Sequence, residues 1–109
     1  VQTCALPIYS VILDTLKEQN PDAEVYVQSI LPMTAWMQEW LPCSRETTCK
    51  FNDRLKIMAE DKGMIYIDLF PLYEKDGEMN PALSFDGIHL NEPEGYDPWA
   101  EAIRQYIYD

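Results

Sequence analysis

The sequence predicts an α/β domain built around a parallel sheet. Segments with helical spacing alternate with short β-rich segments in the order helix, strand, helix, strand, helix. Right-handed crossovers through the helices make consecutive strands of this kind parallel. A chain of 109 residues forms one small domain and not two, and a hydrophobic content of 47% argues against disorder.

The first half of the chain contains one predicted helix and one predicted strand. The helix stops at Asn20-Pro21-Asp22 and has apolar residues at helical spacing, namely Tyr9, Ile12, Leu13 and Leu16. Residues Glu24 to Leu31 alternate and are rich in β-formers, which predicts a strand. Met33 to Leu41 fits either a short helix or an ordered loop.

The second half contains two predicted helices and one predicted strand. Thr48 can cap a helix that ends at Gly63 and has an apolar face of Phe51, Leu55, Ile57, Met58 and Ala59. Met64 to Leu69 is predicted to be a buried strand, and Pro71 to Ser84 a surface loop. The last helix is expected from about Pro93 to Tyr106, with an inward face of Trp99, Ala102, Ile103 and Tyr106.

His89 is the only histidine, and it follows Asp86 by three residues. Its unperturbed pKa suits general-base chemistry near neutral pH. A carboxylate that accepts from Nδ1 fixes the tautomer of such a base, and Gly87 permits the tight turn that would bring Asp86 to it. The spacing alone also fits a surface histidine after an ordinary Asp-Gly turn. We expect this loop beyond the carboxyl ends of the strands.

The string from Leu83 to Asn91, followed by Gly95-Tyr96 and Trp99–Ile103, resembles the last conserved block of the SGNH (GDSL-type) hydrolases. Val25–Pro32 resembles their strand-plus-proline segment, and Asn52–Leu69 their helix followed by a strand ending in Ile-Asp-Leu. Together these cover most of residues 10 to 107. The resemblance implies the C-terminal half of a flavodoxin-like three-layer α/β/α domain with a parallel sheet.

The resemblance implies a serine esterase in which His89 is the general base and Asp86 its partner, with no metal or cofactor. The family's Gly-Asp-Ser nucleophile string and Gly-x-Asn-Asp oxyanion segment do not occur in this sequence. The serines at positions 10, 29, 44 and 84 do not sit on a strand-to-helix elbow, so none is assigned as nucleophile. We therefore expect the chain alone to be inactive, and the parent enzyme to cleave a small-molecule, carbohydrate or lipid ester, a carbohydrate O-acetyl ester among them.

The first eight residues, Val1 to Ile8, match the translation of a common sequencing adapter in one frame. We therefore expect residues 1–8 to be an artefact and residues 9–109 to be the C-terminal part of a single hydrolase domain.

Trp36 and Trp40 are candidate substrate-binding residues, because aromatic walls suit acyl groups and sugars; packing in the core is the competing interpretation. Asp68, which follows the second strand, is more simply a strand-end residue than a catalytic acid.

Cys43 and Cys49 close a short loop and are either a disulfide or two unrelated thiols, with the disulfide slightly favoured. A disulfide would indicate a periplasmic or secreted protein. One imidazole without further spaced ligands argues against a metal site.

A formal net charge of -11 argues against a nucleic-acid partner, because phosphate backbones would be repelled. No run of 18 apolar residues occurs that could span a membrane. The alternative function is a non-catalytic carbohydrate-binding or interaction module of the same fold. The sequence leaves the oligomeric state open.

Overall fold

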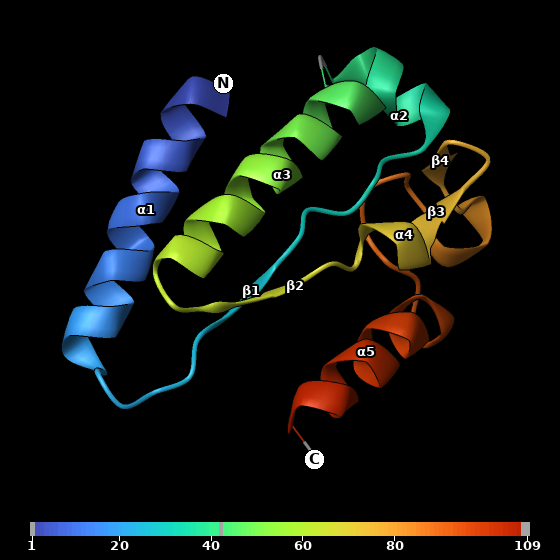
Figure 1. The fold of residues 1–109 in the computed structure, drawn as a ribbon. Helices are drawn as coiled ribbons and strands as arrows, with labels where there is room; N and C mark the ends of the chain where they lie inside the picture. Colours follow the sequence, from blue (N-terminus) through green and yellow to red (C-terminus); the bar gives the residue numbers. More distant parts are fainter. Residues whose placement is uncertain (1, 42, 108–109) are drawn as a thin grey trace.

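A computed structural model describes residues 2–41 and 43–107. The elements along the chain (Figure 1) are α1 (Gln2–Gln19), β1 (Tyr26–Gln28), α2 (Ala35–Trp40), α3 (Arg45–Asp61), β2 (Ile65–Ile67), α4 (Phe70–Tyr73), β3 (Glu74–Lys75), β4 (Glu78–Met79), the 3-10 turns η1 (Pro81–Leu83) and η2 (Glu94–Tyr96), and α5 (Asp97–Ile107).

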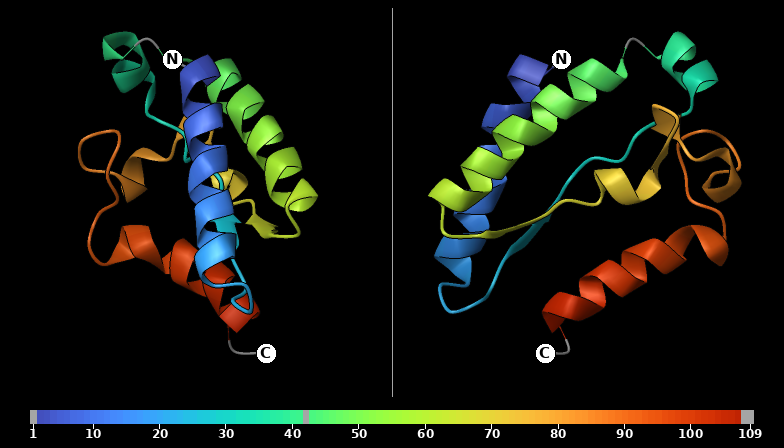
Figure 2. Two further views of the ribbon diagram at one scale, coloured as in Figure 1. Left: turned by 90° about the vertical axis from the view of Figure 1, so that its left-hand side faces the viewer. Right: turned by 45° about the vertical axis from the view of Figure 1, so that its right-hand side comes forward.

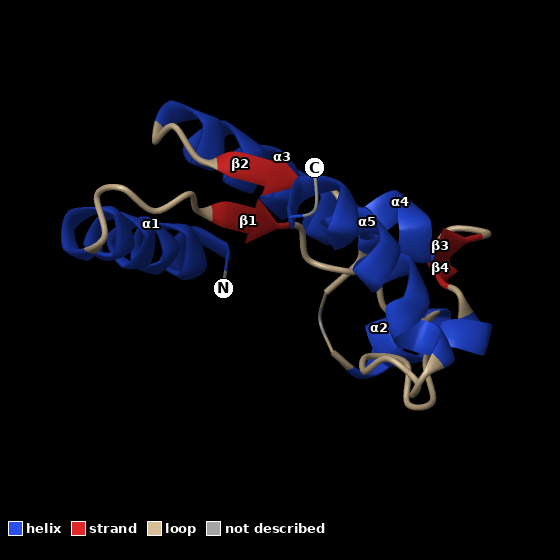
Figure 3. Ribbon diagram, turned by 90° about the horizontal axis from the view of Figure 1, so that it is seen from below, coloured by secondary structure: helices blue, strands red, loops and turns tan. Residues whose placement is uncertain are grey.

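The strands β1 and β2 pair in parallel, with Val27 opposite Tyr66. Helices α1 and α3 lie on one side of this pair and α5 on the other, as the ribbon diagrams show (Figures 1, 2 and 3). Strand alternation fits these layers, because Val27 packs into the core with α1 and α3 while Gln28 accepts a hydrogen bond from Trp99 Nε1 of α5 at 3.1 Å. The predicted α/β class with a parallel sheet is confirmed.

The main core lies between α1, α3 and the sheet. Its buried members are Leu13, Val27, Phe51, Leu55, Ala59 and Met64. Burying one such large apolar side chain stabilises the fold by about 1.5–3 kcal/mol. This core fixes the two strands and thereby the direction in which the chain leaves them.

The helix α3 starts earlier than predicted. Ser44 is its N-cap, and its Oγ accepts from Thr47 N at 3.2 Å, so the prediction of Thr48 as the cap is wrong. Thr48 is buried within the helix. Ile57 is exposed, because it lies two residues from the fully buried Leu55 and therefore on the opposite side of the helix. The predicted end is confirmed by Gly63, which has a φ of +74°.

Both strands are shorter than predicted, because side-chain bonds replace the strand pairing beyond them. Asn52 binds both the N–H and the carbonyl of Ile30, and Ser29 Oγ accepts from the N–H groups of Leu69 and Phe70. Ile65, at the start of β2, is partly exposed, so this strand is less buried than expected.

Residues 71–84 are more ordered than the predicted surface loop. The strands β3 and β4 form a hairpin whose turn residues Asp76 and Gly77 both have positive φ, as a type I′ turn requires. Tyr73, which precedes the hairpin, and Met79, the last residue of β4, are fully buried. The Asp-Gly signal therefore marks a hairpin here, in a segment that includes fully buried side chains.

The segment that the sequence left open forms the helix α2, and the final helix begins at Asp97 rather than near Pro93. Trp99 and Tyr106 of α5 face the sheet, and the Tyr106 ring makes an edge contact with the Tyr26 ring of β1. Both side chains remain partly exposed.

The helix α1 includes residues 2–8, and Ala5 and Leu6 pack against the core. The artefactual origin of residues 1–8 stays a prediction; Val1 and the Cys4 side chain lie outside the described part of the chain. No helix among the described residues is long and apolar enough to cross a membrane.

Candidate active site

The loop that carries Asp86 and His89 is closed by its own backbone and by Ser84. Ser84 pairs with Leu90 in an isolated antiparallel bridge. Its Oγ donates to the His89 carbonyl at 2.7 Å and accepts from Gly87 N at 2.9 Å. Both interactions hold the turn, and they occupy the Ser84 hydroxyl.

Asp86 accepts three hydrogen bonds, all from the turn that it opens. Its Oδ1 accepts from the N–H groups of Ile88 at 2.8 Å and His89 at 2.7 Å. Its Oδ2 lies 2.5 Å from His89 Nδ1. The spacing of three residues therefore brings the two side chains together, as predicted.

These contacts keep the Asp86 carboxyl ionised. The side-chain hydrogen bond with His89 is the largest cause, followed by the two backbone N–H groups, and together they lower the pKa of Asp86 from 3.8 to about 2. An ionised carboxylate only accepts, so Nδ1 of His89 must be the donor. In the neutral ring this leaves Nε2 as the proton acceptor.

The outer side of the His89 ring is open to solvent. The His89 side chain is 71% exposed, whereas that of Asp86 is 34% exposed. The Phe85 ring stacks beside the imidazole, with a centroid distance of 6.2 Å and an angle of 19°. A group that reaches this surface could therefore meet Nε2 directly.

The loop is attached to the chain that leaves the carboxyl end of β1. Thr34 N donates to the Gly87 carbonyl at 3.1 Å. Gly87 has a φ of +90°, a conformation that glycine adopts without strain, which agrees with the role predicted for it. The expected position of the loop beyond the carboxyl ends of the strands is thus observed.

The segment after the loop is fixed by close backbone contacts. Asn91 donates from Nδ2 to the Ala82 carbonyl at 3.1 Å and thereby steadies the turn. A Cβ at Gly95 would lie 2.7 Å from the Leu83 carbonyl oxygen, so only glycine fits there without a shift. The Tyr73 hydroxyl donates to the Gly95 carbonyl at 2.6 Å.

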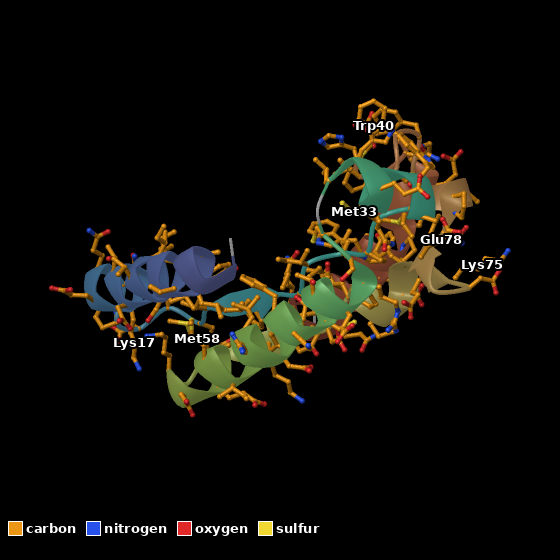
Figure 4. All side chains as sticks on the ribbon, turned by 90° about the horizontal axis from the view of Figure 1, so that it is seen from above. Lys17, Met33, Trp40, Met58, Lys75 and Glu78 are labelled. Atoms are coloured by element: carbon orange, nitrogen blue, oxygen red, sulfur yellow. The ribbon has the colours of Figure 1, made fainter. Side chains whose placement is uncertain are left out.

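Trp36 and Trp40 of α2 both lie at the surface. They are 51% and 78% exposed, so neither is a core residue. The Trp36 ring lies against Gly87, because a Cβ at that glycine would approach Trp36 Cζ2 to 3.2 Å. Trp40 lies at the end of the molecule remote from Lys17 (Figure 4). Their predicted role in substrate binding stays a prediction.

The other residues that the sequence offered as catalytic candidates have structural roles or lie away from the Asp86–His89 loop. Ser29 is buried and accepts from two backbone N–H groups, and Ser44 caps α3. Asp68 is exposed after β2 and lines a cavity of about 170 Å³ together with Asn52 and Tyr66. This cavity does not include Asp86 or His89 among its lining residues.

The two described cysteines are free thiols, so the favoured disulfide between Cys43 and Cys49 is wrong for this structure. Cys43 Sγ instead lies 3.4 Å from Thr48 Oγ1. Without the disulfide, the argument for a periplasmic or secreted protein loses its support. Within residues 2–41 and 43–107, no group of three His, Cys, Asp or Glu side chains could hold a metal ion.

Two residues of this site were missed by the sequence analysis. Phe85 stands within the recognised string, and its position beside His89 could have drawn attention to it. Thr34 has no such signal, because its contact with Gly87 joins parts of the chain that are distant in sequence.

The fold and the loop define an α/β protein with a paired aspartate and histidine beyond its strands. The chain belongs to the GDSL-like lipase/acylhydrolase family, which matches residues 2–97 and so confirms the resemblance.

Solved structures share the fold. A candidate platelet activating factor from Streptococcus pneumonia superposes with a TM-score of 0.88 at 21% identity, over 98% of this chain and 52% of its own. A candidate acylhydrolase from Bacteroides fragilis gives 0.72 at 25% identity, over 90% and 48%. A GDSL-like lipase from Bacteroides thetaiotaomicron gives 0.67 at 22% identity, over 91% and 50%. The chain therefore spans about half the length of these proteins. A comparison with curated proteins gives no match.

Proposed function

We propose that this chain supplies the Asp-His pair of a serine-dependent ester hydrolase. The observation that carries the proposal is the 2.5 Å contact between His89 Nδ1 and an Asp86 carboxylate whose pKa is lowered to about 2. This arrangement orients the ring with Nδ1 toward Asp86 and Nε2 outward, which is the orientation that a general base needs.

The chemistry follows from the orientation of the ring. His89 Nε2 takes the proton of a serine hydroxyl as the serine oxygen bonds to the ester carbonyl carbon. The resulting imidazolium, stabilised by Asp86, then returns the proton to the departing alkoxide, which leaves an acyl-serine. A water molecule, activated by the same nitrogen, releases the acid and restores the serine.

The nucleophile is proposed to come from a polypeptide segment outside this sequence. Ser29, Ser44 and Ser84 serve buried or capping hydrogen bonds, and Ser10 stands within α1. Because the oxyanion donors are proposed to lie outside this sequence too, the 109-residue chain should show no esterase activity by itself.

For the substrate we propose a carbohydrate O-acetyl ester or a related small ester. The exposed rings of Trp36, Trp40 and Phe85 support this choice, because aromatic faces pack against the apolar faces of sugar rings and acyl groups. Trp36 is the member held against the turn that carries His89.

Hydrolysis of an aryl acetate tests the proposal. The 109-residue chain should give only the background rate, and a chain that hydrolyses the ester in a His89-dependent manner would overturn the proposed division of the site.

A longer polypeptide from the same reading frame should hydrolyse the aryl acetate. There His89→Ala should lower kcat by about 10³-fold or more, since the general base is lost. Thr15→Val, on the exposed part of α1, is the control and should keep the rate. Unchanged turnover in His89→Ala would refute the role of His89.

The second candidate is a carbohydrate-binding module without catalysis, which the exposure of Trp40 favours. Titration of the chain with acetylated and unmodified oligosaccharides separates the two. A binding module keeps its affinity in His89→Ala and loses it in Trp40→Ala.

A further inference from the structure

Within the turn that carries His89, Gly87 packs against residues 34–37. A Cβ at Gly87 would lie 2.4 Å from Thr34 Oγ1, 3.1 Å from Met37 Cβ and 3.2 Å from Trp36 Cζ2. Thr34 also donates its N–H to the Gly87 carbonyl at 3.1 Å. Gly87 stands directly between Asp86 and Ile88, whose contacts define the turn. A movement of Thr34 would therefore pass to the Asp86 carboxylate and the His89 ring.

Thr34 has a side chain that its local structure does not explain. The residue is 3% exposed, and its Oγ1 has no hydrogen-bond partner among the described residues. It occupies the N-cap position of α2, where a threonine hydroxyl ordinarily binds a free N–H of the first turn, yet it makes no such bond. A buried hydroxyl without a partner is unfavourable, because its loss of hydration is not offset by a hydrogen bond. The hydroxyl therefore does not cap α2.

The capping role is taken by a residue from another element. Glu78 of β4 accepts from Ala35 N at 2.8 Å, and Met79 N donates to the Met33 carbonyl at 3.0 Å. Figure 4 shows Met33 and Glu78 beside α2. The β3–β4 hairpin thus fixes the backbone on both sides of Thr34, which leaves the Thr34 side chain free to face Gly87.

We propose that Thr34 is a positioning residue for the Asp86–His89 pair. Its N–H and its small hydroxyl set the place of Gly87 and so hold the turn in which Asp86 accepts from His89 Nδ1. The inference rests on the proposed function for its catalytic meaning, but the positioning itself is a property of this chain.

The competing interpretation is that Thr34 only fills space. The two differ in what Thr34→Val should do. Valine has nearly the same shape and removes a buried, unpartnered hydroxyl, so the free energy of unfolding should stay the same or rise. It places a methyl group, which is bulkier than the hydroxyl, against Gly87. Positioning therefore predicts a disturbed His89 in a fold that is no less stable.

His89 offers a clean readout because it is the only histidine of the chain. Long-range ¹H–¹⁵N spectra of the uniformly labelled 109-residue chain, recorded at alkaline pH where the ring is neutral, distinguish the Nδ1–H from the Nε2–H tautomer. The wild type should show mainly the Nδ1–H form. In Thr34→Val the ratio of Nδ1–H to Nε2–H should fall about three- to tenfold, as expected when one well-placed hydrogen bond is weakened. Chemical denaturation measures stability in parallel.

Three further variants complete the experiment. Thr34→Ser keeps the hydroxyl and should retain the wild-type ratio. Thr34→Ala removes the hydroxyl and leaves Gly87 unsupported, so it should lower the ratio; it decides the matter together with Thr34→Ser if the valine variant does not fold. Thr48→Val is the matched control, because Thr48 is also buried but contacts Cys43 rather than the turn. It should leave the His89 spectrum unchanged.

A wild-type tautomer ratio in both Thr34→Val and Thr34→Ala would overturn the proposal, as would an equal change in Thr48→Val. These outcomes are independent of catalysis. If the tautomer ratio changes with the Thr34 substitutions but the longer polypeptide has no esterase activity, the positioning role stands and the proposed function is refuted. If the longer polypeptide shows His89-dependent hydrolysis but the tautomer ratio does not change with Thr34, the proposed function stands and the positioning role is refuted.

Discussion

Asp86 both builds its turn and orients the imidazole, because one carboxylate accepts two backbone N–H groups and one ring nitrogen. Its pKa of about 2 is below the ordinary 3.8, so the stabilisation by the ionised form is complete above 3.8. It is lost as the pH falls through about 2. The structure therefore predicts a turn that holds throughout neutral and mildly acidic pH.

The largest cause of that low pKa can be removed by His89→Ala, which leaves no side-chain donor at this position. The pKa of Asp86 should then rise toward 3.8 but remain below it, because the N–H groups of residues 88 and 89 still bind Oδ1. Carboxyl ¹³C shifts followed over pH measure the change. Glu74, whose pKa is lowered chiefly by Arg45, is an internal control and should not move. An unshifted Asp86 in the variant would contradict the assigned cause.

Gly87→Ala should destabilise the chain more than Gly77→Ala. Both glycines have positive φ, +90° and +83°, so both substitutions strain the backbone by about 1–3 kcal/mol. Only at Gly87 does the new Cβ also meet Thr34 Oγ1 at 2.4 Å, whereas nothing lies within 4 Å at Gly77. The added cost should be about 1–3 kcal/mol, measured by urea denaturation. If both variants lose the same free energy of unfolding, the contact between residue 87 and Thr34 adds no cost and the prediction is wrong.

For single residues, the sequence predicted the contacts between residues that are close together in the chain. Asp86, Gly87 and His89 lie on one turn, so their spacing and the permissive glycine suffice to bring them together. Thr34 could not be found in the same way, because its contact depends on how the chain returns after β4.

At the level of the elements, the Tyr73 hydroxyl of α4 forms hydrogen bonds with both η2 and α5. The buried Tyr73 donates to the Gly95 carbonyl and accepts from Trp99 N at 3.0 Å. This bond pair fixes where the segment after the His89 loop enters α5.

Tyr73→Phe should lower the free energy of unfolding by about 1–3 kcal/mol, since it leaves a buried carbonyl and an N–H without their partner. Tyr96→Phe, at a partly exposed position nearby, should change it by less than about 0.5 kcal/mol. Thermal or urea denaturation compares the two variants. Similar stabilities would mean that water replaces the Tyr73 hydroxyl.

The sequence predicted the three long helices and the two parallel strands but misjudged their ends. Periodicity identifies an apolar face, yet the start of α3 depends on Ser44 reaching Thr47 N. Likewise, the Asp76-Gly77 signal fits a loop or a hairpin, and only the antiparallel pairing of Glu74–Lys75 with Glu78–Met79 decides between them.

Over the whole molecule, apolar surface remains exposed on one face of α1. Ile8, Ile12 and Leu16 follow one another at intervals of four residues and are all exposed. Among the described strands, β1 pairs only with β2, so its other edge is open. Open strand edges and apolar patches promote association.

The 109-residue chain should therefore self-associate in a concentration-dependent manner, as sedimentation velocity would show. The double substitution Ile8→Glu and Ile12→Lys keeps the net charge and should shift the protein toward monomer. Ile57→Gln, at an equally exposed position on α3, is the control and should leave association unchanged. A wild-type chain that stays monomeric at high concentration would refute the prediction.

The fold class could be predicted from the alternation of helical and β-rich segments, because each crossover helix has few ways to pack on its strands. The exposure of Trp36 and Trp40 could not, since an aromatic pair at that spacing suits a core as well as a surface.

We propose that His89 and Asp86 serve a serine nucleophile encoded next to this chain. Reading the source DNA upstream of the codon for Ser10 tests it most directly. We expect an in-frame Gly-Asp-Ser followed by a Gly-x-Asn-Asp segment. A reading frame that contains neither would contradict it and leave binding as the better function.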